Sequence, residues 1–202
     1  MKEKPVFVVD LDNTLWPFEK PLREHLHRYF DMPIDVKWDK WEFYKDYAIS
    51  DSDFYEAVAK IHRMAGIFPQ EHRPYKGAAE LLDYLNHLGT VVIATHREPS
   101  LFHMTANYLN NWGLKAPGLY VGWDKSFLYT DNAIVIDDSP KNIQIAIGRG
   151  IPVLSLRQYW NKDMNLPLFD SLNGIYEYIS RMDFNDGKKI PMFSMQQGKG
   201  RV

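Results

Sequence analysis

Five short runs of apolar residues, rich in valine and isoleucine, constrain the fold of this chain more than any other feature. Most are continuously apolar and do not alternate with polar residues, which is typical of strands covered on both faces, as in parallel sheets. The runs are Val6–Val9, Thr90–Thr95, Leu119–Gly122, Ala133–Ile136 and Pro152–Leu156. They predict five strands of one parallel sheet.

Helical patterns separate these strands in the second part of the chain. Apolar residues recur at helical spacing, glycine follows one helix and serine-proline opens another. The predicted helices cover Ala78–Leu88, Pro99–Trp112, Ser139–Gly148 and Leu172–Met182. From Tyr75 onward helix and strand therefore alternate, which predicts an α/β fold with an open, doubly wound sheet.

The interval between the first two strands, from about Leu15 to Pro74, contains no convincing strand and is rich in aromatic residues. It is predicted to form helices over Leu22–Phe30, Trp38–Tyr47 and Asp53–Ala65, the last capped by Asp51-Ser52. The predicted organisation is thus an α/β core in residues 1–15 and 75–183, a helical insertion in residues 16–74, and a C-terminal tail in residues 184–202.

Composition excludes several classes of function. The 202 residues include no cysteine, which rules out thiolate metal sites and a cysteine nucleophile, and the seven histidines lack metal-ligand spacing. The formal net charge of −2 argues against nucleic acid polymers and anionic membranes as partners. No segment approaches the roughly 20 apolar residues of a membrane span, so a cytoplasmic protein is expected.

Two pairs of acids follow two of the predicted strands directly. Asp10 and Asp12 come after the first strand, and Asp137 and Asp138 come after the fourth. Because the carboxyl ends of parallel strands share one edge of the sheet, where α/β proteins bind ligands, we expect all four acids to meet there. Carboxylates gathered in this way repel one another unless a cation intervenes. A magnesium ion is therefore predicted as the cofactor.

Other polar residues are expected at the same edge. Thr95 ends the second strand, and its hydroxyl is placed to donate to a phosphate oxygen. His96 and Arg97 follow it and are candidate substrate ligands. Lys125, just beyond the third strand, is placed to neutralise a phosphate, with Lys141 as the rival candidate.

In this order, Asp10-Leu11-Asp12-Asn13-Thr14, Thr95, Lys125 and Asp137-Asp138 resemble the four motifs of the haloacid dehalogenase-like hydrolase superfamily. The resemblance implies a Rossmann-like sheet of order 5-4-1-2-3 with a helical cap after the first strand.

The resemblance also implies a catalytic role for each motif residue. Asp10 would attack phosphorus, and Asp12 would act as general acid and then general base. Magnesium would be held by Asp10, the backbone carbonyl of Asp12 and Asp137, with Asp138 as a direct or indirect ligand. Thr95 and Lys125 would hold the phosphoryl oxygens. An acid at position 12 favours phosphate ester chemistry over dehalogenation.

Two narrower resemblances concern the substrate. Residues Leu11–Phe18 look like the opening of the magnesium-dependent phosphatase-1 group, whereas the helical insertion looks more like that of the 5′(3′)-deoxyribonucleotidases. Asn13-Thr14 departs from the Gly-Val that is usual in the second group. Trp16, Phe18 and Trp41 are the aromatic candidates for stacking on a base.

The expected function is thus a magnesium-dependent phosphomonoester hydrolase that forms an aspartyl-phosphate. Its expected partner is a small phosphorylated substrate, with a nucleoside monophosphate favoured. A sugar or protein phosphatase, a phosphotransferase of the same superfamily and a catalytically silent phosphate-binding protein remain as alternatives.

Overall fold

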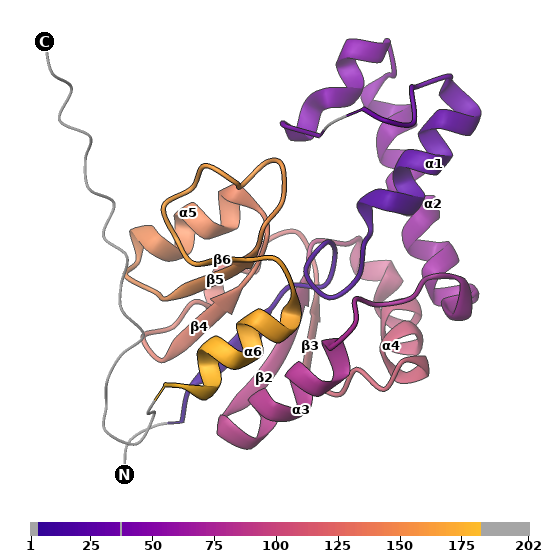
Figure 1. The fold of residues 1–202 in the computed structure, drawn as a ribbon. Helices are drawn as coiled ribbons and strands as arrows, with labels where there is room; N and C mark the ends of the chain where they lie inside the picture. Colours follow the sequence, from indigo (N-terminus) through magenta and orange to yellow (C-terminus); the bar gives the residue numbers. More distant parts are fainter. Residues whose placement is uncertain (1–3, 37, 183–202) are drawn as a thin grey trace, which may run out of the picture.

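The computed structural model describes residues 4–36 and 38–182, so the predicted tail, residues 184–202, lies outside the described residues. Within them, one parallel sheet runs through the protein with helices on both faces (Figure 1). No helix in this part of the chain is both long and apolar enough to cross a membrane.

The sheet has six strands in the described residues, in the order β3-β2-β1-β4-β5-β6, and every pairing is parallel. The strands are β1 (Val6–Val9), β2 (Thr90–Thr95), β3 (Gly118–Val121), β4 (Ala133–Ile136), β5 (Val153–Leu156) and β6 (Leu168–Phe169). The predicted order of the first five is confirmed. Sequence analysis missed β6 because its two residues are too short to form a pattern.

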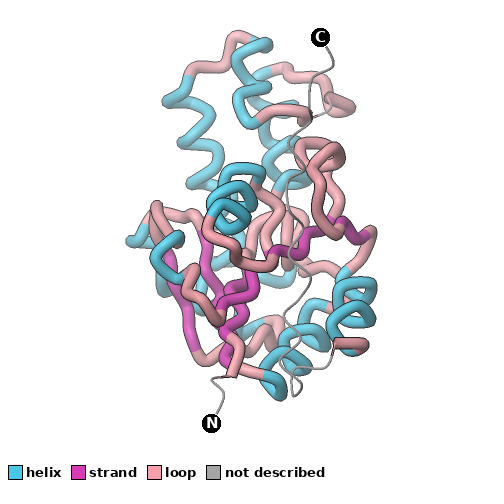
Figure 2. Tube along the Cα trace, turned by 90° about the vertical axis from the view of Figure 1, so that its left-hand side faces the viewer, coloured by secondary structure: helices cyan, strands magenta, loops and turns pink. Residues whose placement is uncertain are grey.

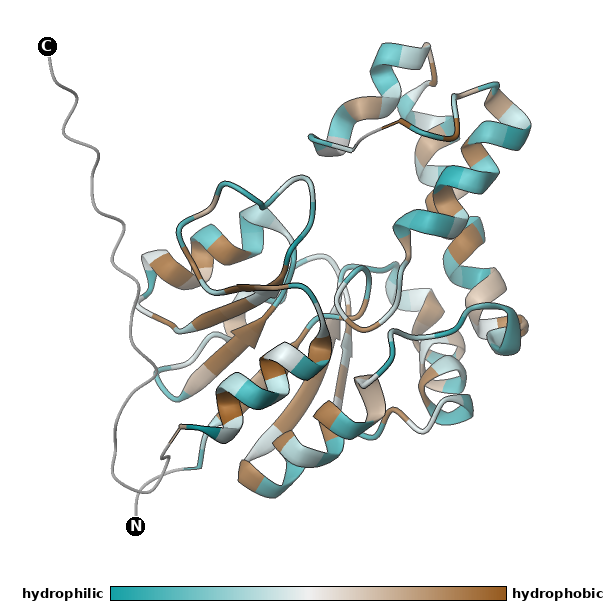
Figure 3. Cartoon of the chain, viewed as in Figure 1, coloured by the Kyte–Doolittle hydropathy of each residue, from teal (hydrophilic) through white to brown (hydrophobic). Residues whose placement is uncertain are grey.

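The continuously apolar strands are covered on both faces, as predicted (Figure 3). Phe7 and Val9 of β1 belong to the larger apolar cluster, which includes residues of α3 (Ala78–Leu88) and α6 (Leu172–Ser180). Val8, between them, belongs to a second cluster with residues of α5 (Pro140–Gly148). The central strands β1 and β4 are thus buried on both faces, which accounts for their continuously apolar sequences.

The remaining helical elements are α1 (Glu19–Phe30), η1 (Trp41–Tyr47), α2 (Asp51–Ile67), η2 (Pro69–Glu71), η3 (Pro99–Leu101), α4 (Phe102–Asn111) and η4 (Ser126–Leu128). Two local predictions need correction. The helix expected over Trp38–Tyr47 is a shorter 3-10 segment with a kink at Glu42. The cap of α2 is Ser50, whose hydroxyl accepts a hydrogen bond from the Asp53 amide at 3.1 Å, whereas Asp51 and Ser52 lie inside the helix.

The elements from α1 to η2, here called the helical insert, project beyond the carboxyl ends of the strands (Figures 1 and 2). Their aromatic side chains pack mainly on one another. Trp38 stacks on Phe43 with ring centroids 4.2 Å apart, and Tyr44 stacks on Phe54 at 3.9 Å. All four are buried, so these rings form the insert's own core.

The C-terminal part of α2 is fixed to α4. A Cβ atom at Gly66 would lie 2.4 Å from Met104 Cβ, so only glycine permits this approach of the two helices. Asn107 Nδ2 donates to the Gly66 carbonyl at 2.6 Å, and Trp112 Nε1 donates to the Pro69 carbonyl at 2.9 Å. The insert is therefore anchored to the rest of the chain along this helix.

Candidate active site

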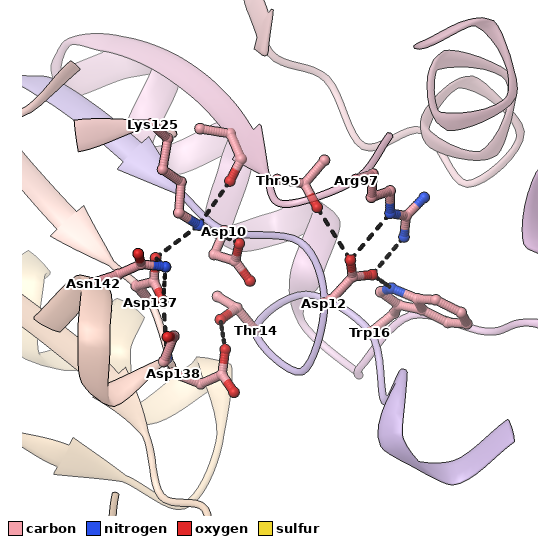
Figure 4. A network of polar contacts seen from close by, with 12 residues as sticks. Asp10, Asp12, Thr14, Trp16, Thr95, Arg97, Lys125, Asp137, Asp138 and Asn142 are labelled. Carbon is pink, nitrogen blue, oxygen red and sulfur yellow. Dashed lines mark hydrogen bonds and ion pairs between the residues drawn. The ribbon is translucent and has the colours of Figure 1, made fainter. Parts of the chain in front are cut away.

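The loop after β1 sends its two acids to different places. Asn13 adopts a left-handed conformation, with φ of 58°, which asparagine tolerates better than most residues. The turn closes through hydrogen bonds from the Asn13 amide to the Trp16 carbonyl at 2.8 Å and from the Leu15 amide to the Leu11 carbonyl at 2.9 Å. Figure 4 shows the result: Asp10 faces one polar group and Asp12 faces another.

The first group is centred on Lys125, which lies just beyond β3 and is 1% exposed. Its Nζ forms an ion pair with Asp10 Oδ1, a second ion pair with Asp137 Oδ2 at 2.8 Å, and a hydrogen bond to the Ala94 carbonyl at 3.0 Å. Lys141 is exposed on α5. In this structure Lys125, and not its rival Lys141, is thus the lysine paired with Asp10.

Asp138 lies beside this group with partners of its own. Thr14 Oγ1 donates to its Oδ1 at 3.3 Å, and Trp160 Nε1 donates to its Oδ2 at 3.0 Å. Asn161 Nδ2 holds its backbone carbonyl at 3.1 Å. Trp160 and Asn161 belong to the loop after β5, which carried no recognisable motif, so sequence analysis missed them.

Asn142 was also missed. Its Nδ2 contacts both carboxylate oxygens of Asp137, at 3.3 and 3.1 Å. An asparagine in the first turns of the helix that follows the strand-end acids is the signal that would have identified it. Asp137 also accepts a hydrogen bond from the Ser139 amide at 2.9 Å, so its carboxylate lies beside the residue that precedes α5.

Burial governs the electrostatics of these acids. Burial raises the pKa of Asp10 to about 7, because the attraction of Lys125 is outweighed by desolvation together with the repulsion from Asp137 and Asp12. Burial and the charges of Asp10 and Asp137 also raise the pKa of Asp138 well above its usual range. The charge of Lys125 is favoured despite its burial, because Asp10 and Asp137 raise its pKa. The group therefore contains more carboxyl groups than Lys125 alone can keep ionised.

This excess is suited to a metal ion. Carboxylate oxygens of Asp10, Asp137 and Asp138 all lie within 4.8 Å of one another, and all three residues are buried. A hard divalent cation prefers such oxygen ligands and would favour the ionised form of each acid. The predicted ligand set therefore fits, except that the side chain of Asp12 is not part of this group.

Asp12 forms the centre of the second group. Its Oδ2 accepts hydrogen bonds from Thr95 Oγ1 at 3.1 Å and Arg97 Nε at 3.1 Å. Its Oδ1 accepts from an Arg97 terminal nitrogen at 2.5 Å and from Trp16 Nε1 at 2.6 Å. Burial opposes ionisation, but Arg97 and then His62 lower the pKa of Asp12 well below its usual range. Arg97 therefore neutralises the charge of Asp12, for which a cation shared with the other three acids had been predicted.

His62, on α2, completes this second group. Its Nε2 lies 3.2 Å from Asp12 Oδ2, although not in the alignment of a formed hydrogen bond. The ring is 4% exposed and packs against Phe18 with centroids 4.6 Å apart. Burial lowers the pKa of His62, opposed by the charge of Asp12. Nothing in the local sequence distinguishes it from the other six histidines, because its partner lies 50 positions earlier in the chain.

The predicted substrate ligands have varied surroundings. Trp16 and Phe18 are buried, at 1% and 2% exposure, and the side chain of Trp41 lies outside what the structure describes. Arg97 is buried against Asp12. His96 is half-buried, and burial together with the nearby charge of Lys125 lowers its pKa. Of the two residues after Thr95, only His96 keeps partial access to solvent.

Comparisons with known proteins agree with this architecture. No protein-family model matches the sequence, and no curated protein matches it. Among solved structures, a predicted phosphatase from Clostridium acetobutylicum superposes with a TM-score of 0.66 at 16% identity, covering 90% of this chain and 100% of the other.

Two further structures give similar results. A hydrolase of the haloacid dehalogenase-like family from Streptococcus pneumoniae has a TM-score of 0.63 at 15% identity, covering 89% of this chain and 100% of the other. A protein classed with the HAD hydrolases from Bacillus subtilis, bound to magnesium, has a TM-score of 0.53 at 18% identity with the same coverage. The chain therefore has the haloacid dehalogenase-like fold that its motifs resemble.

The position of Lys125 leads to a prediction about stability. Replacing it in Lys125→Met leaves Asp10 and Asp137 buried without their cation, so we expect the free energy of unfolding to fall by about 3–5 kcal/mol. Lys141→Met, which removes an exposed lysine, is the matched control and should change it by less than about 0.5 kcal/mol. Urea unfolding followed by circular dichroism measures both, and equal losses in the two variants would contradict the assignment.

Proposed function

We propose that this protein is a magnesium-dependent phosphomonoester hydrolase that works through an aspartyl-phosphate on Asp10. The observation that carries the proposal is the buried group of Asp10, Lys125, Asp137 and Asp138 at the carboxyl ends of β1 and β4. The group combines a candidate nucleophile, Asp10, with the cation of Lys125 and with carboxylates that are suitable metal ligands.

The arrangement supplies each requirement of the first chemical step. Lys125 holds one oxygen of Asp10, which leaves the other to attack phosphorus. Arg97 and His62 favour the ionised form of Asp12 in the free site, so Asp12 first takes up a proton, from solvent or from the monoanion of the substrate. As the bond from Asp10 to phosphorus forms, the ester bond breaks, and the protonated Asp12 donates this proton to the leaving oxygen. Thr95 and Lys125 donate hydrogen bonds to the phosphoryl oxygens.

The second step reverses the role of Asp12. It takes a proton from a water molecule, whose oxygen attacks phosphorus and releases phosphate and the free Asp10 carboxylate. A magnesium ion held by Asp10, Asp137 and Asp138, together with the backbone carbonyl of Asp12, would neutralise phosphoryl oxygens when bound. The magnesium in the Bacillus subtilis neighbour and the naming of the Clostridium neighbour as a phosphatase support both parts of the proposal.

We assign the cap role to the helical insertion, residues 16–74, because it lies beyond the strand ends that carry the acids. The substrate class rests on narrower support. Of the rings proposed to stack on a base, Trp16 and Phe18 are buried, and the side chain of Trp41 lies outside what the structure describes. The choice of a nucleoside monophosphate as substrate is therefore supported by the resemblance alone. Sugar phosphates, phosphorylated side chains and transfer to a second acceptor are the competing outcomes.

The nucleophile is tested by Asp10→Asn. The neutral amide is a far weaker nucleophile, so we expect hydrolysis of 4-nitrophenyl phosphate to fall at least about 1,000-fold, with an unchanged circular dichroism spectrum. Asp170→Asn, at an exposed acid paired with Arg157, is the control and should keep full activity. Undiminished turnover by Asp10→Asn would exclude this mechanism.

The metal is tested by chelation. The three buried acids repel one another without a cation, so turnover should stop in excess chelator and return when magnesium is added back beyond the chelator. Isothermal titration with magnesium alone should give one site in the wild type and none in Asp137→Asn. Full activity in excess chelator would remove magnesium from the proposal.

The substrate class is tested by a panel of phosphomonoesters under equal conditions. We expect nucleoside monophosphates to have higher kcat/KM than sugar phosphates or phosphoserine peptides, with free phosphate as the product. A preference for sugar phosphates rejects the nucleotidase assignment. A phosphorylated alcohol in place of free phosphate identifies a transferase, and binding without release of phosphate identifies a silent protein.

A further inference from the structure

The contacts of Asp12 go beyond what a general acid and base requires. Four hydrogen bonds converge on its two oxygens, from Trp16, Thr95 and two nitrogens of Arg97, and His62 Nε2 lies 3.2 Å from Oδ2 without an aligned hydrogen bond. A carboxylate offers about four lone-pair sites, so Asp12 is saturated in this structure. A saturated carboxylate has no free site for a substrate oxygen, and at least one donor must leave before a proton is transferred.

Arg97 is fully committed to this group. Its Nε and one terminal nitrogen hold the two oxygens of Asp12, and its other terminal nitrogen donates to Thr105 Oγ1 of α4 at 3.3 Å. The side chain is 1% exposed. With its Nε and one terminal nitrogen bound to Asp12 and its side chain buried, the guanidinium presents no exposed edge to a phosphate. In this arrangement Arg97 acts on Asp12 and not on the substrate.

His62 is held in place by the anchored part of α2. It lies one turn before Gly66, where α2 touches Met104 of α4 too closely for any side chain. Its ring packs on Phe18, and its Nε2 faces Asp12 Oδ2 without an aligned partner among the described residues. This nitrogen therefore lies against Oδ2 without occupying one of its lone pairs.

The two carboxylate oxygens of Asp12 differ in the lengths of their contacts, and this difference indicates a separate role for each. Oδ1 has the two shortest contacts, 2.6 Å to Trp16 and 2.5 Å to Arg97. Oδ2 has three longer ones, 3.1 Å to Thr95, 3.1 Å to Arg97 and 3.2 Å to His62. Thr95 is the donor expected to turn to the phosphoryl group, and its departure frees Oδ2.

We infer that Arg97 and His62 are positioning residues for Asp12: Arg97 holds Oδ1, and Arg97 and His62 both contact Oδ2 and direct it at the ester oxygen for proton transfer. This inference rests on the proposed function. It reassigns Arg97 from the substrate to the acid, and it gives the helical insert a part in the chemistry through His62.

Leaving-group dependence distinguishes this role from a merely structural one. The value of kcat/KM reports the steps up to departure of the alcohol. A nitrophenolate leaves with little need of a proton, whereas phenol and alkyl alcohols depend on the acid. A displaced Asp12 therefore slows poor leaving groups much more than good ones, while general damage slows all of them equally.

The experiment measures kcat/KM for a series of substituted phenyl phosphates and an alkyl phosphate. We expect Arg97→Met to lose about 100-fold on the alkyl ester but less than about 10-fold on 4-nitrophenyl phosphate, within the usual contribution of general acid catalysis. Asp12→Asn should show the same steepened dependence. The slope of log kcat/KM against the pKa of the leaving alcohol measures this dependence. His62→Leu should steepen the slope less than Arg97→Met does, and His62→Gln, which keeps a donor, should partly restore the wild-type slope.

Arg181→Met and His87→Leu, at side chains on the surface of α6 and α3, serve as matched controls and should keep the wild-type slope. Arg97→Lys keeps the positive charge but loses the two-nitrogen contact with Asp12, so it should give an intermediate slope. This variant provides the test if Arg97→Met fails to fold. A wild-type slope in folded Arg97 and His62 variants overturns the inference. A wild type that hydrolyses no phosphate ester overturns the proposed function instead.

Discussion

The ion pairs of Lys125 with Asp10 and Asp137 are the interaction on which the rest of the site depends. They join residues that follow three strands, β1, β3 and β4, at a place where neither acid has solvent to stabilise its charge. A buried pair of this kind gains little net stability, but loss of one partner leaves an uncompensated charge. Lys125 therefore joins the segments that follow these three strands, and it lies beside the candidate metal ligands Asp10, Asp137 and Asp138.

The turn at Asn13 is the second determinant, because it divides one short acidic motif into two chemical roles. Residues two apart in a strand face the same way, and on that basis Asp10 and Asp12 were expected to share a cation. The left-handed residue between them breaks this relation. Asp10 enters a group with more carboxyl groups than Lys125 alone can keep ionised, whereas Asp12 enters one in which Arg97 balances its charge.

Local sequence patterns predicted the strands and the polar residues at their ends. Continuous apolar runs identified β1 to β5, and the family resemblance implied their order. Acids at strand ends identified Asp10 and Asp137, and its place just beyond the third strand identified Lys125. These patterns did not identify Trp160, Asn161 or His62. Each contacts an aspartate at least 22 positions away in the sequence and lies in a loop or helix that has no motif of its own. Arg97 was noticed but given to the substrate, since its partner is set by the turn at Asn13 and by Thr105 of α4.

The helical insert shows why aromatic content is a poor guide to specificity. An insert of this size needs a core of its own, and Trp38, Phe43, Tyr44 and Phe54 provide it by stacking on one another. Rings buried for that purpose are not available to a base. The link from the insert to the described chemistry is a polar one, from His62 to Asp12, and it is held where α2 is fixed on α4. In the proposed mechanism the insert therefore acts on the reaction through Asp12, an acid that belongs to the core.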